Sequence, residues 1–115
     1  MISVLIFSAC AKKEVKVTKE QMYTKAKAAD ESTTFVIPKA GEGPSCGDYA
    51  EGCLSTNIVQ VKKLDLIAVE FMSEEQAIYA AKKVNGYYVN NWMLDDVTGE
   101  PTLERFAKSI EAKKP

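Results

Sequence analysis

The stretch Leu66-Ile-Ala-Val-Glu-Phe71, followed almost at once by Ser73-Glu-Glu-Gln76, decides the fold of this 115-residue chain. Its first part has the β-branched and aromatic composition of a strand. Side chains alternate along a strand, so Ile67, Val69 and Phe71 share one face. The second part has the spacing of a capping box, which marks the start of a helix. The stretch therefore predicts a strand that leads directly into a helix.

The predicted helix has a narrow apolar face made of small residues, which suits close packing on a sheet. These residues are Ala77, Ala80, Ala81 and Val84. The pair Asn85-Gly86 predicts the end of the helix, with the glycine just past its last turn.

Two further strand-like runs flank this unit. Asn57 to Lys62 precedes it, and the connection Lys63-Leu-Asp65 is short enough for an antiparallel hairpin. Tyr87 to Leu94 follows the helix and is expected to return as one strand. Alternation along that strand places Tyr88 and Trp92 on the same face. We expect one face of this strand to be buried and the other to be partly exposed.

The two ends of the chain add further elements. Thr18-Lys-Glu-Gln21 is a second capping box and predicts a short helix over 18–29. Thr33 to Ile37 has the composition of a strand and stops at Pro38. Pro101 occupies the first position of a last helix, whose apolar residues recur with helical spacing. These apolar residues are Leu103, Phe106, Ala107 and Ile110.

The pattern as a whole predicts an α+β fold. We expect a small antiparallel sheet of three to four strands, with two helices packed on one of its faces. A chain of 115 residues has room for one such domain, and no internal repeat is visible.

The run Val69 to Ala77, continuing to Val84-Asn-Gly86, resembles the third strand and second helix of an RNA-recognition motif. The resemblance implies that 66–94 forms part of a ferredoxin-like unit. In that family, aromatic rings on the third strand stack on bases. Leu66 and Ala68 occupy those positions here, so we predict no binding of nucleic acid.

A second resemblance concerns the SPOR-type periplasmic module, which binds the glycan strands of peptidoglycan. Ile58-Val-Gln-Val61 and Ser73-Glu-Glu-Gln-Ala77 are similar to the starts of its strand and helix. The similarity is one of architecture, which by itself does not establish function. It keeps glycan binding open as an alternative.

The first ten residues, Met1-Ile-Ser-Val-Leu-Ile-Phe-Ser-Ala-Cys10, are a short apolar run that ends in small residues and a cysteine. Phe7, Ser8, Ala9 and Cys10 resemble the lipobox of bacterial lipoproteins, in which the cysteine carries diacylglycerol. The resemblance implies lipidation of Cys10 and a membrane partner. The alternative is a buried strand followed by a plain thiol, which would favour a cytoplasmic interaction domain.

The lipobox interpretation divides the chain into three parts. Residues 1–9 are then the remnant of a signal peptide, 10–32 a tether with a short helix, and 33–115 the folded domain. Residues 11–27 carry six lysines and two glutamates, so this segment suits either anionic lipid headgroups or a solvated linker. Ala11 stands where some bacteria use aspartate to retain lipoproteins in the inner membrane. We therefore expect the outer membrane, facing the periplasm.

Two cysteines remain, Cys46 and Cys53, in a glycine-rich stretch. In an oxidising periplasm they are expected to form a disulfide, which stabilises the fold by up to about 2.5 kcal/mol for a loop of this length. Free thiols are the next alternative. The chain has no histidine, and the spacing of the two cysteines matches no zinc pattern, so no metal site is predicted.

The remaining polar motifs point away from catalysis. Without histidine, a Ser-His-Asp or Cys-His arrangement is impossible, and no nucleotide-binding glycine loop is present, so no cofactor is predicted. The acidic run 95–100 is expected to form a turn, with Glu100 capping the last helix. Tyr88 and Trp92 are the candidate binding residues if they are exposed, whereas a buried Trp92 would serve the core.

These observations favour a non-catalytic envelope lipoprotein that presents a small domain to a protein partner. A module that binds peptidoglycan or another glycan is the alternative.

Overall fold

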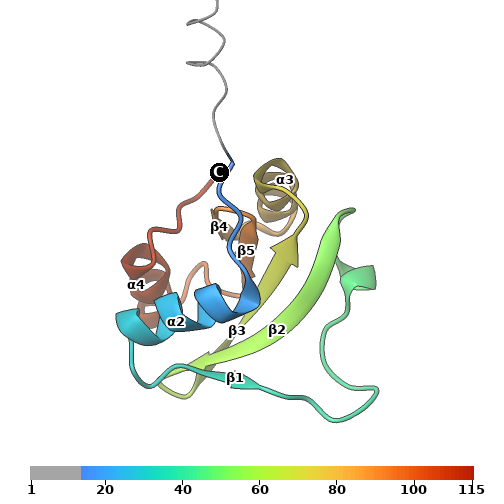
Figure 1. The fold of residues 1–115 in the computed structure, drawn as a ribbon. Helices are drawn as coiled ribbons and strands as arrows, with labels where there is room; N and C mark the ends of the chain where they lie inside the picture. The colour runs from blue at the N-terminus through green and yellow to red at the C-terminus, as the bar shows by residue number, and fades with distance from the viewer. Residues whose placement is uncertain (1–13) are drawn as a thin grey trace, which may run out of the picture.

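Over residues 14–115, which this computed structural model describes, a five-stranded antiparallel sheet carries the fold (Figure 1). Its strand order is β1-β2-β3-β5-β4. The strands are β1 (Thr34–Val36), β2 (Cys53–Val61), β3 (Leu64–Phe71), β4 (Tyr87–Val89) and β5 (Trp92–Asp95). The helices are α2 (Lys19–Ala29), α3 (Glu74–Val84) and α4 (Pro101–Ser109), with a 3₁₀ turn η1 (Cys46–Asp48). The predicted α+β class is confirmed, with more strands and helices than expected.

The helices cover both faces of the sheet, so the expectation that they share one face is wrong. Helices α2 and α4 pack on the face that carries Leu66 and Trp92. Helix α3 packs on the opposite face, against Val69, Phe71 and Met93. The nearly continuous apolar run of β3 explains this arrangement, because a strand buried on both sides has no polar face to keep in water.

The segment Tyr87 to Leu94 is a hairpin rather than one strand. Its two-residue turn is Asn90-Asn91, and Asn90 adopts a left-handed backbone with φ 52°, a conformation that asparagine tolerates better than most residues. Because of this turn, the prediction that Tyr88 and Trp92 share a face of the sheet is wrong. Tyr88 lies on the α3 side with Met93, whereas Trp92 lies on the side of α2 and α4.

The hairpin of β2 and β3 also has a tighter turn than predicted. Val61 pairs with Leu64, so the connection is the pair Lys62-Lys63 and not residues 63–65. Both lysines have positive φ, at 49° and 69°. This geometry matches the right-handed twist of the two strands, but it is one that glycine or asparagine adopts more readily.

Helix α2 belongs to the packed domain and not to a tether. Its capping box is present as predicted, with Thr18 and Gln21 satisfying each other's backbone N–H groups. Met22 and Ala26 are buried in the same cluster as Val17. The folded domain therefore includes much of the segment 10–32 that was expected to be a tether. The signal-peptide remnant 1–9 and the lipidation site Cys10 lie outside the described residues.

The other helix boundaries agree with the sequence patterns. Ser73 caps α3 by accepting a hydrogen bond from the N–H of Gln76, and Glu100 caps α4. At the end of α3 the left-handed residue is Asn85, with φ 56°. Gly86 serves a different purpose from the one predicted, because a Cβ there would lie 2.5 Å from the carbonyl oxygen of Leu94. None of the helices in residues 14–115 has the length and apolar character needed to cross a bilayer.

Candidate functional site

The disulfide predicted between Cys46 and Cys53 is present, with the two Cα atoms 5.5 Å apart. It ties η1 to the first residue of β2. Two side chains hold the same loop to the sheet. The Thr56 hydroxyl donates to the carbonyl of Pro44 at 2.9 Å, and the Tyr49 hydroxyl donates to the Asp95 carboxylate at 2.9 Å. The loop is therefore a fixed part of the domain surface.

The contact between Tyr49 and Asp95 is structural in character. Burial raises the pKa of the Tyr49 phenol, and the hydrogen bond to Asp95 raises it further. The phenol consequently keeps its proton at neutral pH and acts as a donor, not as a base. Burial also raises the pKa of Asp96, with the neighbouring Asp95 adding to the effect. The run 95–100 forms the predicted turn and helix cap.

Trp92 is not a surface binding residue. Its side chain is 0 % exposed, and its indole N–H donates to the carbonyl of Val17 at 2.7 Å. The neighbouring Asn91 accepts from the N–H of Val17 at 2.7 Å and donates to the carbonyl of Phe71 at 3.1 Å. Trp92 thus belongs to the core and secures the start of α2, which rules out stacking on a glycan.

Tyr88, the other candidate, is half-buried on the edge strand β4. It borders a shallow depression together with polar side chains from three parts of the chain. These side chains are Glu74, Asn90, Glu111 and Lys113. The Lys113 ammonium lies 6.0 Å from the centre of the Tyr88 ring. Tyr88 and Trp92 lie on opposite faces of the sheet, so the two candidates do not form one site.

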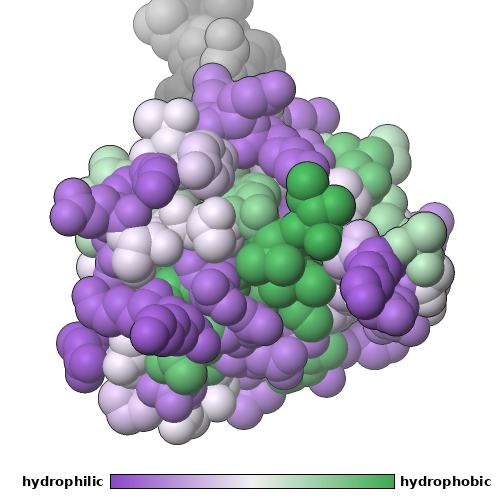
Figure 2. All heavy atoms as spheres, turned by 90° about the horizontal axis from the view of Figure 1, so that it is seen from below, coloured by the Kyte–Doolittle hydropathy of each residue, from purple (hydrophilic) through white to green (hydrophobic). Residues whose placement is uncertain are grey.

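A surface that sequence reasoning missed lies at the other edge of the sheet. Val36 is exposed, and Ile37 is 92 % exposed. Phe35 is half-buried and meets the ring of Tyr23 in α2 edge-on, with the ring centres 5.1 Å apart. We call these four residues the β1 edge. Figure 2 shows apolar side chains gathered on the side of the molecule where β1 lies in Figure 1.

A groove adjoins the β1 edge, between β1, the middle of β2 and the loop before η1. Apolar side chains form most of its wall, and they include Val36, Ile37, Pro38, Pro44 and Ile58. The only sequence signal for this surface was the adjacent pair Val36-Ile37 at the end of a short strand. Neighbouring residues on a strand point to opposite faces, so the pair cannot be buried by a single helix layer.

The described residues hold no group of three Cys, Asp or Glu side chains placed to bind a metal ion. The chain has no histidine to add to such a group.

No protein-family model matches this chain, and searches of curated proteins and of solved structures give no match either.

Proposed function

We propose that this protein is a non-catalytic, lipid-anchored protein of the bacterial cell envelope, on the outer membrane facing the periplasm, that presents the β1 edge to a partner protein. The observation that carries the proposal is the exposure of Val36, the last residue of the edge strand β1, and of Ile37 directly after it. Large apolar side chains gathered on a surface mark an interaction site more often than scattered single ones do.

The two edges of the sheet differ in a way that favours β1 as the binding edge. At β4, Tyr88 and Lys113 exchange two backbone hydrogen bonds of 2.9 Å, so the C-terminal segment closes that edge. Among residues 14–115, strand β1 pairs only with β2. An open edge offers backbone groups to an extended segment of another protein, and side-chain pockets beside it supply the specificity.

The partner that fits is an extended segment of a second protein with an apolar residue for the groove beside Ile37. Pro38 limits the length of the paired segment, because proline has no N–H to donate. We therefore expect a short strand of about three or four residues, matching β1, with most of the affinity coming from the apolar side chains.

The anchor rests on the likeness of Phe7 to Cys10 to a lipobox, and the disulfide Cys46–Cys53 is consistent with an oxidising compartment. Intact mass tests it directly. The protein is expressed in a bacterial host from its native upstream region, with and without Cys10→Ser. A mass gain that matches acyl chains and is lost in the variant supports the anchor, whereas an unmodified chain overturns it.

The binding edge is tested by photo-crosslinking in the same host. A photoreactive amino acid replaces Ile37 in one strain and Lys82, an exposed residue of α3, in a matched control. A discrete protein adduct from position 37 that is absent from position 82 is expected. In a further strain the photoreactive amino acid replaces Val36, and Ile37 is either native or changed to Asp. Ile37→Asp leaves the backbone of the edge intact and should prevent the adduct from position 36. Equal labelling at 37 and 82 would contradict the proposal.

Glycan binding is the second candidate, and one observation favours it. The depression beside Tyr88 combines a half-buried aromatic ring with several hydrogen-bonding side chains, as sugar sites do. Tyr88→Ala should then abolish retention of the protein on purified peptidoglycan, whereas Ile37→Asp should leave retention unchanged. Trp92→Ala is unsuitable for this test, because Trp92 lies in the core.

A further inference from the structure

Three large apolar side chains are exposed at the end of the domain where the described chain begins. Val15 is 59 % exposed, Leu54 is 56 % exposed and Met72 is 55 % exposed. Leu54 and Met72 come from neighbouring chain segments, because the N–H of Met72 donates to the carbonyl of Gly52 at 2.9 Å. We call these three residues the apolar tip.

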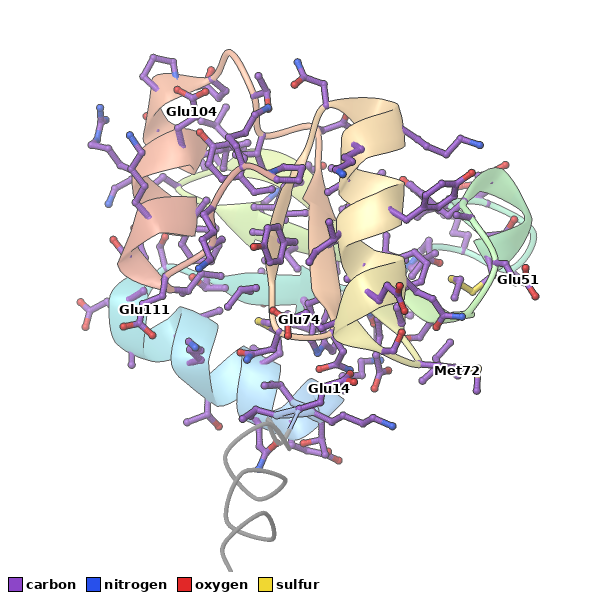
Figure 3. The ribbon with its side chains drawn as sticks, turned by 90° about the horizontal axis from the view of Figure 1, so that it is seen from above. Glu14, Glu51, Met72, Glu74, Glu104 and Glu111 are labelled. Atoms are coloured by element: carbon purple, nitrogen blue, oxygen red, sulfur yellow. A yellow bond between two sulfur atoms is a disulfide. The ribbon has the colours of Figure 1, made fainter. Side chains whose placement is uncertain are left out.

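The start of the described chain is fixed to this same end. The carboxylate of Glu14 accepts a hydrogen bond of 2.7 Å from the N–H of Glu74 in the first turn of α3, where a negative charge is favoured by the helix dipole. Figure 3, which looks onto this end, shows Glu14 next to Glu74, with Met72 farther along. Three residues later, Val17 is held by Asn91 and Trp92. Residues 14–17 are therefore held against the surface of the domain by hydrogen bonds at both ends.

The proposed anchor lies within a short reach of the apolar tip. Cys10 precedes Glu14 by four residues, and four extended residues span at most about 14 Å. We infer that the apolar tip rests on the lipid bilayer when Cys10 is acylated, so that the side chains of Val15, Leu54 and Met72 contact the membrane surface. This orientation rests on the proposed lipidation of Cys10.

The lipid anchor adds to the weak membrane affinity of the apolar tip. Three partly exposed side chains do not hold a protein on a membrane, but a short tether raises the effective concentration of the bilayer to the order of millimolar or above. The lysines at 12, 13 and 16 lie in the same stretch of sequence and favour anionic headgroups within a Debye length. In this orientation the β1 edge, at the opposite end of the molecule in Figure 1, faces away from the membrane.

Methyl NMR of a chain that runs from Cys10 to Pro115 tests the orientation without depending on acylation in cells. Cys10 is coupled to a maleimide lipid, with the disulfide intact, in nanodiscs of phosphatidylethanolamine and phosphatidylglycerol. A lipid with a gadolinium-labelled headgroup is then added. We expect loss of the methyl signals of Met72, Leu54 and Val15, with the Ile37 signal retained. Loss of all four signals, or of Ile37 alone, would overturn the orientation.

A paired variant adds a second measurement. Met72→Gln with Val15→Gln removes two apolar side chains at exposed positions. It should restore the Leu54 signal in the labelled nanodiscs, whereas Tyr79→Gln, at an exposed position on α3, should not. The two proposals fail separately. If the chain is acylated in cells but the methyl signals of the apolar tip persist in the nanodiscs, the orientation alone is overturned. If the chain is not acylated in cells, the anchor on which the orientation depends is overturned.

Discussion

The Lys62 ammonium in the turn between β2 and β3 lies 2.7 Å from the Asp30 carboxylate, which stands just past the end of α2. Ser32 adds two further hydrogen bonds to the same carboxylate, one from its hydroxyl and one from its N–H. The hydroxyl of Ser32 also accepts from the N–H of Lys62. One small polar cluster therefore connects α2 to a hairpin about thirty residues away.

This cluster predicts a pH-dependent contribution to stability. The hydrogen bonds from Lys62 and Ser32 lower the pKa of Asp30 to about 2, whereas an unfolded aspartate titrates near 3.9. A depressed folded-state pKa stabilises the fold above about pH 4, and the contribution is lost as the pH falls toward 2. The midpoint of urea unfolding should therefore be higher for the native chain than for Asp30→Asn at pH 6, with the difference vanishing near pH 2. Glu31→Gln is the matched control, and a constant difference across this range would contradict the assignment.

The left-handed turn predicts a stabilising substitution. Lys63 has φ 69°, which costs an L-residue more than it costs glycine. Lys63→Gly should raise the free energy of unfolding by about 0.5–1 kcal/mol, since it relieves the turn and leaves the contact of Lys62 with Asp30 in place. Lys82→Gly, inside α3, should instead lower it by about 1 kcal/mol. Urea unfolding distinguishes the two, and a loss of stability in both variants would show that the Lys63 turn carries no strain.

Gly86 predicts a strongly destabilising substitution. An added Cβ would meet the carbonyl oxygen of Leu94 at 2.5 Å, and this oxygen belongs to a buried strand that has little room to move. Gly86→Ala should therefore lower the free energy of unfolding by about 1–3 kcal/mol. Gly47→Ala is the control, because its Cβ would lie 3.6 Å from the nearest side-chain atom, an ordinary contact. Equal thermal midpoints for the two variants would contradict the close approach.

The disulfide predicts sensitivity to reductant. Opening the Cys46–Cys53 bond releases a loop of about eight residues, which lowers the free energy of unfolding by up to about 2.5 kcal/mol. Unfolding curves with and without a phosphine reductant measure the difference. The double variant Cys46→Ser, Cys53→Ser should give one curve under both conditions, close to that of the reduced native chain. A native chain indifferent to reductant would exclude a stabilising role.

Local signals in the sequence were sufficient for most of the individual elements. The capping boxes at Thr18 and Ser73 begin helices as predicted, and the strand-like run before Pro38 forms β1. The hairpin of β2 and β3 is also present, with a shorter turn. These features follow from interactions within a few residues, which a single sequence displays directly.

The layer arrangement could not be predicted with the same ease. A helix pattern gives the apolar side of a helix but not the face of the sheet that it covers. The turn at Asn90-Asn91 lacks the Asn-Gly or Asp-Gly pair that usually marks a hairpin, so two strands were predicted as one. The thin apolar face of α2 gave little indication that Met22 and Ala26 are buried, since their partners lie far away in the sequence.

The surfaces proposed for binding were harder still to predict. Whether Trp92 is exposed depends on the turn two residues earlier, which decides the face on which its side chain lies. Ile37 is exposed because β1 stands at the edge of the sheet, and strand order is a property of the whole fold. Both outcomes depend on tertiary pairing, which residue type and spacing do not report.

The hydrogen bond from the indole of Trp92 to the carbonyl of Val17 joins residues 75 positions apart, and this separation has a consequence for the order of events during biosynthesis. The first helix of the described chain is made early, but its docking site is completed only when the β4–β5 hairpin has been made. Contacts between such distant residues form late and slow the folding of a domain. A nascent chain would thus leave α2 without its docking site until nearly all of the domain has been synthesised.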